Sequence, residues 1–130
     1  MPLTVQQMME AANAAVERID GQRAQELVAQ GALLLDIRDA PELQNAGRAA
    51  VSHHIPRGML EFRADPNTQF HDPELTFDRP IVLHCASGGR AALAGKLLKD
   101  MGYAQVYNMG GLEDWKTSGG AMIEAVDQGM

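Results

Sequence analysis

Three short apolar runs, separated by segments with helical spacing, constrain the fold of this chain more than any other feature. They are ALLLDI at 32–37, IVLH at 81–84 and QVYNM at 105–109. Strands buried on both faces of a sheet have such nearly continuous apolar sequences. Because helical segments alternate with these strands, the pattern predicts an α/β fold with a mostly parallel central sheet and helices on both faces.

Apolar residues at helical spacing predict the helices that cover this sheet. An extra N-terminal helix that lies on the core is predicted from apolar residues three to four positions apart, namely Val5, Met8, Met9, Ala12 and Val16. Further helices are predicted over 22–30, 40–47, 57–62, 89–101 and 110–119, with a weaker strand over 49–55, a surface loop over 65–80 and a tail over 121–130.

Length and charge limit the classes of function. A chain of 130 residues is the size of one ordinary domain, which predicts a single domain over 1–130. Seventeen acidic against eleven basic residues give a net charge of -6, which argues against a nucleic-acid partner. No apolar run approaches the roughly 20 residues needed to cross a bilayer, so no membrane partner is predicted.

The N-terminal segment and the cysteine content predict a cytoplasmic location. The segment lacks the basic start, continuous apolar centre and small-residue cleavage site of a secretory signal. Cys85 is the only cysteine, so it cannot form an internal disulfide. We therefore expect a free thiol in a reducing compartment.

Cys85 lies where one apolar run ends, and the residues after it form a glycine-rich turn into a helix. Backbone N–H groups of residues 86–90, together with the N-terminus of that helix, would form an anion site around the sulfur and favour the reactive thiolate. The segment from Asp36 to Arg38 also lies at the carboxyl end of a predicted strand and should reach the same edge of the sheet. A buried cysteine can instead be ordinary core packing, but the glycine-rich turn favours a nucleophile.

Two residues of this turn have alternative roles. Ser87 would either donate a hydrogen bond to a sulfur species on Cys85 or shape the turn. Arg90 would either hold an anionic substrate or fix the loop by binding a carbonyl group.

The four histidines do not predict a metal site. His53 and His54 are adjacent in a predicted strand, so their side chains should point to opposite faces. His84 should likewise point away from the face that Cys85 uses. No metal site is therefore predicted from these three residues and His71.

The segment CASGGR, from Cys85 to Arg90, resembles the active-site loop of the rhodanese family. LLLDIRDAPEL at 33–43 is similar to a Leu-Asp-x-Arg-x-x-x-Glu segment of that family, with Asp36, Arg38 and Glu42 in the matching positions. Residues 110–115, which end in Trp115, resemble the closing Gly-Gly-x-x-x-Trp segment of the family. The resemblance covers a core of about residues 16–118.

The resemblance implies a rhodanese-like fold and a sulfurtransferase activity. In this family a cysteine accepts a sulfane sulfur from thiosulfate as a persulfide and passes it to cyanide or a thiol. Cys85 would be the nucleophile, and the residues that hold the substrate sulfur would be Ala86, Ser87, Gly88, Gly89 and Arg90. Arg38 and Glu42 would form a structural pair. No cofactor would be needed, and the acceptor could be a small thiol or a thioredoxin-like protein.

Two other functions are considered. A phosphatase on a related fold would have five residues between cysteine and arginine, whereas Cys85 and Arg90 have four between them. A binding or regulatory module without turnover would often lack the cysteine. Both are disfavoured against a sulfurtransferase.

Overall fold

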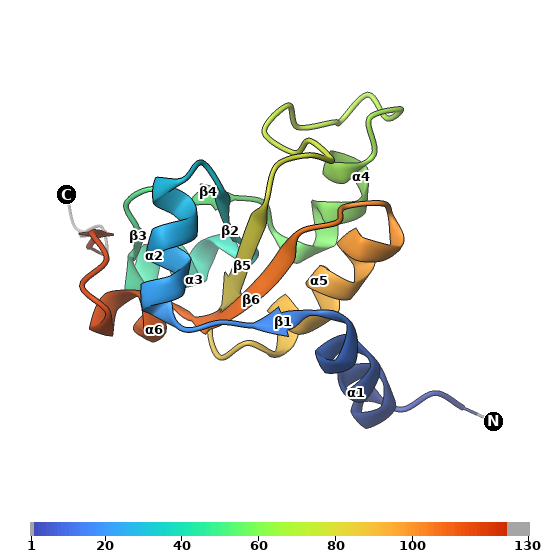
Figure 1. Cartoon of the computed structure of the whole chain (residues 1–130), viewed down its shortest axis with the longest axis horizontal. Coiled ribbons are helices and arrows are strands. Elements are labelled where there is room, and N and C mark those ends of the chain that lie inside the picture. Colours follow the sequence, from blue (N-terminus) through green and yellow to red (C-terminus); the bar gives the residue numbers. More distant parts are fainter. Residues whose placement is uncertain (1, 125–130) are drawn as a thin grey trace.

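The computed structural model describes residues 2–124, whose centre is a five-stranded sheet in the order β1-β6-β5-β2-β4 (Figure 1). Every pairing in this sheet is parallel. Its strands are β1 (Glu17–Arg18), β2 (Leu33–Asp36), β4 (His53–His54), β5 (Ile81–Cys85) and β6 (Val106–Gly111). The predicted α/β fold with a mostly parallel sheet is therefore confirmed.

Helices cover both faces of the sheet (Figure 1). One face carries α2 and α6, and the other carries α1, α4 and α5. The helices are α1 (Val5–Ala15), α2 (Gly21–Ala29), α3 (Ala40–Ala46), the 3-10 turn η1 (Arg57–Met59), α4 (Leu60–Ala64), α5 (Gly89–Asp100) and α6 (Leu112–Thr117). Two further strands, β3 (Arg48–Ala49) and β7 (Met122–Ile123), form a small antiparallel sheet.

Side-chain caps fix where three of these helices begin. Thr4 accepts a hydrogen bond from the Gln7 amide and starts α1, and Asp20 accepts one from the Arg23 amide and starts α2. At α3 the Glu42 side chain accepts a hydrogen bond from the Asp39 amide. Such caps satisfy amides that have no partner within the helix.

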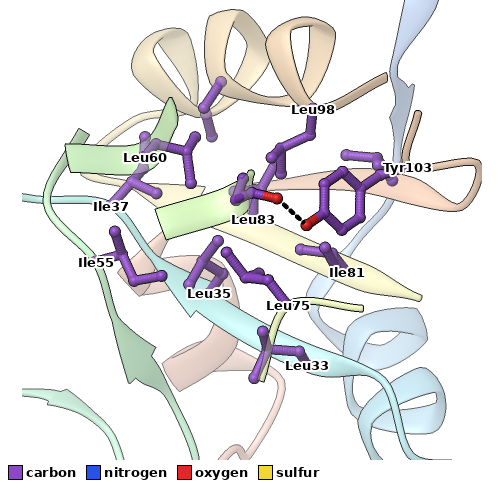
Figure 2. Close-up of a cluster of buried hydrophobic side chains, with 14 of the residues drawn as sticks. Leu33, Leu35, Ile37, Ile55, Leu60, Leu75, Ile81, Leu83, Leu98 and Tyr103 are labelled. Carbon is purple, nitrogen blue, oxygen red and sulfur yellow. Dashed lines mark hydrogen bonds between the residues drawn. The ribbon is translucent and has the colours of Figure 1, made fainter. Parts of the chain in front are cut away.

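The larger core lies between the sheet and α5 (Figure 2). Its side chains are mostly aliphatic, and the hydroxyl of Tyr103 donates a hydrogen bond of 2.6 Å to the carbonyl of Ala64. The core includes Leu33, Leu35, Ile37, Ile55, Leu60, Leu75, Ile81, Leu83, Leu98 and Cys85. Cys85 therefore extends the apolar face of β5 up to the end of the strand.

The opposite face of the sheet packs against α2 and α6. Leu34 and Val82 point to this side, where they meet Leu27 of α2 and Trp115 of α6. The indole of Trp115 donates a hydrogen bond of 3.0 Å to the carbonyl of Ala121. Alternate residues of β2 and β5 thus face the two cores, as expected for central strands.

The structure corrects two predicted elements. The strand predicted over 49–55 is wrong, because a turn at 50–52 divides it into β3 and β4, which belong to different sheets. The Ser52 hydroxyl and amide both bond to the Ala49 carbonyl and hold this turn. The N-terminal helix is present as α1, but Val5 and Met8 are 69% and 38% exposed instead of lying on the core.

Other parts of the chain follow the prediction with different ends. The loop over 65–80 contains no helix or strand, and the tail forms β7 before residues 125–130, which lie outside the described part. The two-residue strand β1 has no apolar run and was not predicted. Among the described residues, no helix combines the length and apolar character that a membrane span requires.

Candidate active site

Cys85 is the last residue of β5 and is 1% exposed. Its Sγ accepts a hydrogen bond from the backbone amide of Gly88, with a distance of 3.0 Å between nitrogen and sulfur. His84, the preceding residue, lies on the opposite face of the sheet, within 3.7 Å of Asp36. The sulfur is therefore fixed at the carboxyl edge of the sheet by the loop that follows it.

Gly88 gives this loop its shape. Its φ of 109° lies in the left-handed region that glycine adopts without strain, and it is the residue before the first turn of α5. A side chain at this position would contact the backbone of Gly110 and the guanidinium group of Arg18. The tight turn from Cys85 into α5 thus requires glycine here.

The remaining residues of the loop lie around the sulfur with different exposure. Ala86 and Ser87 are exposed, whereas Gly89 and Arg90 are half-buried in the first turn of α5. Within residues 2–124, no protein oxygen accepts a hydrogen bond from the amides of these four residues. These amides are available to an anion bound above Cys85, as at other helix N-termini.

Asn108 of β6 supports the loop from below, a role that the sequence analysis missed. Its side-chain amide donates to the carbonyl of Gly88 at 3.1 Å and accepts from the amide of Gly110 at 2.8 Å. An irregularity between β5 and β6 pairs Leu83 with Asn108 but His84 with Gly110, one residue further on. The signal available in the sequence was an asparagine two residues before the Gly110-Gly111 pair, at the end of a strand next to β5.

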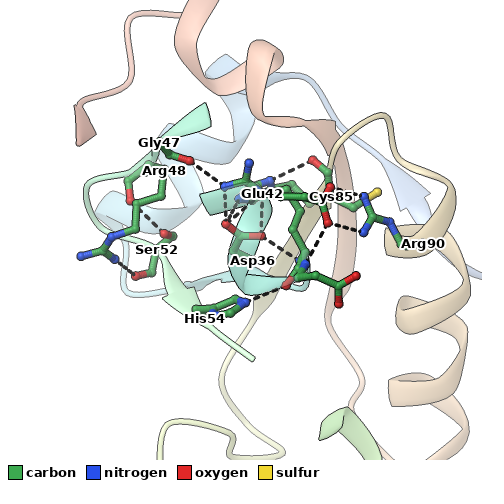
Figure 3. A network of polar contacts seen from close by, with 12 residues as sticks. Asp36, Glu42, Gly47, Arg48, Ser52, His54, Cys85 and Arg90 are labelled. Atoms are coloured by element: carbon green, nitrogen blue, oxygen red, sulfur yellow. Dashed lines mark hydrogen bonds and ion pairs between the residues drawn. The ribbon is translucent and has the colours of Figure 1, made fainter. Parts of the chain in front are cut away.

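Arg90 forms a bidentate ion pair with Glu42 of α3, and Figure 3 shows this pair beside Cys85. Both hydrogen bonds measure 2.8 Å. The Arg90 hydrogen bonds lower the pKa of Glu42 from 4.5 to about 2. Hydrogen bonds to Glu42 likewise raise the pKa of Arg90 above its ordinary value. The guanidinium group therefore joins the start of α5 to the start of α3.

The pairing of Arg38 with Glu42 implied by the family resemblance is wrong. Arg38 turns back onto Asp36, with hydrogen bonds of 3.0 and 2.8 Å to its two carboxylate oxygens, and also donates to the carbonyl of Gly47 (Figure 3). The physical reason is burial: Asp36 is fully buried and needs a cation, while Glu42 lies at the surface within reach of Arg90.

Asp36, Arg38 and His84 form a buried polar cluster under the loop. Burial raises the pKa of Asp36, but the hydrogen bonds from Arg38 outweigh it and the pKa lies below its ordinary value. Burial lowers the pKa of His84. His84 Nδ1 lies 3.2 Å from the Cys85 carbonyl, and among the described side chains its Nε2 has no hydrogen-bond partner.

The other histidines make separate contacts. His53 pairs with Asp72, His54 contacts the carbonyl of Arg38, and His71 contacts the carbonyl of Leu75. Within residues 2–124, no group of three or more histidine, cysteine, aspartate or glutamate residues is arranged to hold a metal ion.

Known proteins resemble this chain along most of its length. Residues 12–118 match the model of the rhodanese-like domain family. The thiosulfate sulfurtransferase GlpE of Ectopseudomonas mendocina is 31% identical over 105 residues, which cover 78% of this chain and 86% of that protein.

Solved structures give the same fold. A Rhodopseudomonas palustris protein, RPA3614, described as of unknown function and a possible tyrosine phosphatase, superposes with a TM-score of 0.82 at 34% identity. The match covers 95% of this chain and 99% of that one. The polysulfide-sulfur transferase homodimer of Wolinella succinogenes matches with a TM-score of 0.74 at 29% identity, over 94% of this chain and 88% of that one.

Proposed function

Because this chain belongs to the rhodanese family, we propose that it is a sulfurtransferase in which Cys85 carries the transferred sulfur. The observation that supports this proposal most is the hydrogen bond from the Gly88 amide to Cys85 Sγ. The amides of the other loop residues donate no hydrogen bond to a protein oxygen in the described part of the chain. A sulfur anion on Cys85 would find donors there without a change of the fold.

The proposed reaction has two steps. The Cys85 thiolate attacks the outer sulfur of thiosulfate; the S–S bond of thiosulfate breaks, and sulfite leaves with the bonding electrons. Cyanide then attacks the outer sulfur of the persulfide, thiocyanate forms, and the electrons of the second S–S bond return to Cys85 as thiolate. The charge balances in each step, and no cofactor is needed. Double-displacement kinetics should result.

The loop residues have distinct proposed roles. The amides of Ala86, Ser87, Gly88, Gly89 and Arg90 hold the persulfide. Because the Arg90 side chain is already bound by Glu42 in two hydrogen bonds, we assign it the role of fixing the loop. Ser87 is exposed and has no assigned partner in the described part of the chain, so its hydroxyl remains a candidate donor to the bound sulfur.

The acceptor is proposed to be a thiol, either a small molecule or a thioredoxin-like protein, with cyanide as the assay substrate. Thiosulfate, or another persulfide, is the proposed donor. The GlpE relatives are described as thiosulfate sulfurtransferases, which supports this donor.

A phosphatase is the second candidate because of the description of the R. palustris protein. A catalytic arginine must bind phosphate oxygens, and here Arg90 would first have to release Glu42. The spacing of four residues between Cys85 and Arg90 also makes a smaller loop than the phosphatase pattern requires. Both features favour a single sulfur atom as the bound group.

Intact mass spectrometry tests the proposal. Thiosulfate should add one sulfur atom to the protein, cyanide should remove it with release of thiocyanate, and Cys85→Ser should show neither change. Hydrolysis of p-nitrophenyl phosphate without any sulfur uptake would support the phosphatase instead. A folded protein with a free thiol that takes up no sulfur and hydrolyses no phosphate would indicate a binding module.

A further inference from the structure

A largely apolar groove with a volume of about 490 Å³ runs along α5 beside the candidate active site. Leu93 and Leu97 of α5 form its floor, and Met8 and Ala11 of α1 form one wall. Arg90 is also part of its lining. Met8, which the sequence predicted in the core, is exposed to this groove.

Arg90 connects the groove with Cys85. It lies five positions after Cys85, in the first turn of α5, and lines the groove at this end of the helix. Figure 3 shows its guanidinium group beside the sulfur. Hydrogen bonds to Glu42 are the main cause of the raised pKa of Arg90, and the nearby Cys85 makes a smaller contribution. A ligand in the groove would therefore have one end at Arg90, where the loop that follows Cys85 enters α5.

The cations along the groove already have partners. Arg90 pairs with Glu42 at 2.8 Å, Arg57 with Glu61 at 2.9 Å, and Lys96 with Asp100 at 2.8 Å. The groove thus presents apolar side chains between neutralised charges. The complementary ligand has an uncharged apolar body, since a second anion would compete with three existing ion pairs.

The two assay substrates of the proposed reaction do not fill such a groove. Thiosulfate and cyanide are small anions, whereas cavities of this size hold ligands with many more atoms. In addition, α1 residues up to Ala11 precede the family match over 12–118. The wall formed by Met8 and Ala11 therefore lies outside the part of the chain that the family model matches.

We propose that this groove binds the sulfur acceptor, a thiol with an unbranched apolar body whose sulfhydryl end lies at Arg90. The proposal rests on the sulfurtransferase function above. The thiol sulfur attacks the outer sulfur of the Cys85 persulfide, and the S–S bond to Cys85 breaks. Its electrons return to Cys85 as thiolate, and the thiol proton moves from the attacking sulfur to the terminal sulfur of the product persulfide.

A series of linear thiols tests this inference. The protein is first loaded with sulfur from thiosulfate, and the rate of persulfide loss is then followed by intact mass with ethanethiol, butanethiol and hexanethiol. These thiols have nearly the same acidity, so their rates compare the fit of the alkyl chain. We expect kcat/KM to rise by roughly threefold for each added methylene that the groove buries.

Two variants and a control locate the effect. Met8→Gln and Leu97→Gln should each lower the ratio of the hexanethiol rate to the cyanide rate by roughly tenfold, because they place an amide in the apolar lining. Val5→Gln changes a residue of the same helix that is 69% exposed and does not line the groove, so it should keep the wild-type ratio. Circular dichroism verifies that all three variants are folded.

The outcomes separate the two proposals. Equal rates for ethanethiol and hexanethiol, or an unchanged ratio in both groove variants, would overturn the acceptor site even if cyanide still removes the sulfur. Failure to load sulfur from thiosulfate would instead refute the proposed function, because no persulfide would exist to be discharged.

Discussion

The guanidinium group of Arg90 binds the carboxylate of Glu42 with two hydrogen bonds of 2.8 Å, across 48 positions of sequence. Arg90 belongs to the helix that follows β5, and Glu42 to the helix that follows β2. The pair therefore joins the segments that follow β2 and β5 at the carboxyl edge of the sheet, where Cys85 is the last residue of β5. Its geometry is the planar, bidentate one that arginine forms best.

Glu42→Gln should lower the free energy of unfolding by about 1 kcal/mol at neutral pH, a value limited by the partial exposure of the pair. Because the folded pKa of Glu42 is about 2 and its ordinary value is 4.5, the stabilisation is fully present above pH 4.5. It is lost as the pH falls from 4.5 towards 2. Urea unfolding of both proteins across this range measures the difference. Glu61→Gln removes the ion pair between Glu61 and Arg57 and is the control. If the difference in unfolding free energy between the wild type and Glu42→Gln stayed constant with pH, the prediction would be contradicted.

Gly88→Ala should destabilise the protein by roughly 1–2 kcal/mol and slow sulfur uptake. The cost arises because φ is 109° and because the new Cβ would lie 3.1 Å from the Cα of Gly110. Relaxation of this strain would also move the amide that holds Cys85 Sγ. Thermal unfolding and the rate of mass gain with thiosulfate measure the two effects.

Gly89→Ala is the matched stability control for that variant. Gly89 has no positive φ, and its added Cβ would have open space around it. Its melting temperature should equal or exceed that of the wild type, since alanine favours the helix. If Gly88→Ala and Gly89→Ala had the same melting temperature, the backbone conformation of Gly88 would not be the cause of the lost stability.

Asp36→Asn should cost roughly 3–5 kcal/mol of stability, because it leaves the charge of Arg38 buried without its counterion. Arg38 is 2% exposed and Asp36 is fully buried. The double variant Asp36→Leu/Arg38→Met removes both charges and should lose less than the single variant. Chemical denaturation compares the two, and an equally large loss in the double variant would show that the charge is not the cause.

Gly95→Ala should destabilise the contact between α5 and the chain segment after α1. A Cβ at this position would lie 2.9 Å from a methyl group of Val16, whose branched side chain has few alternative rotamers. Val16→Ala in the same chain should relieve this clash. The double-mutant cycle should therefore show a favourable coupling of about 1 kcal/mol; simple additivity of the two unfolding energies would refute a direct contact.

Much of the fold was predictable because β2, β5 and β6 are buried on both faces and leave continuous apolar runs in the sequence. The two-residue strands β1 and β4 leave no such pattern, because so short a segment gives no period. Helix ends were predictable where a glycine stops the helix, as at Gly31 and Gly102.

In the candidate site, the Cys85 loop was predictable from the turn chemistry of adjacent residues. The partners of Arg38 and Arg90 were not, because the choice among Asp36 and Glu42 depends on burial that arises only in the folded chain. Asn108 was missed for the same reason: its contact joins β6 to the loop at Gly88, 20 positions earlier in the sequence. Sequence pattern located the loop of the proposed nucleophile, but not the residues that hold this loop.

Both edges of the main sheet are formed by strands of two residues, β1 and β4. An edge this short offers too few unpaired backbone groups for an extended segment of another protein to join the sheet. In the described part of the molecule, a protein acceptor that approached the main sheet would therefore have to present its thiol through side-chain contacts with helices and loops. Recognition of that kind depends on shape and composition at the surface, so changes at helix positions such as Leu93 can alter partner choice while the sheet stays the same.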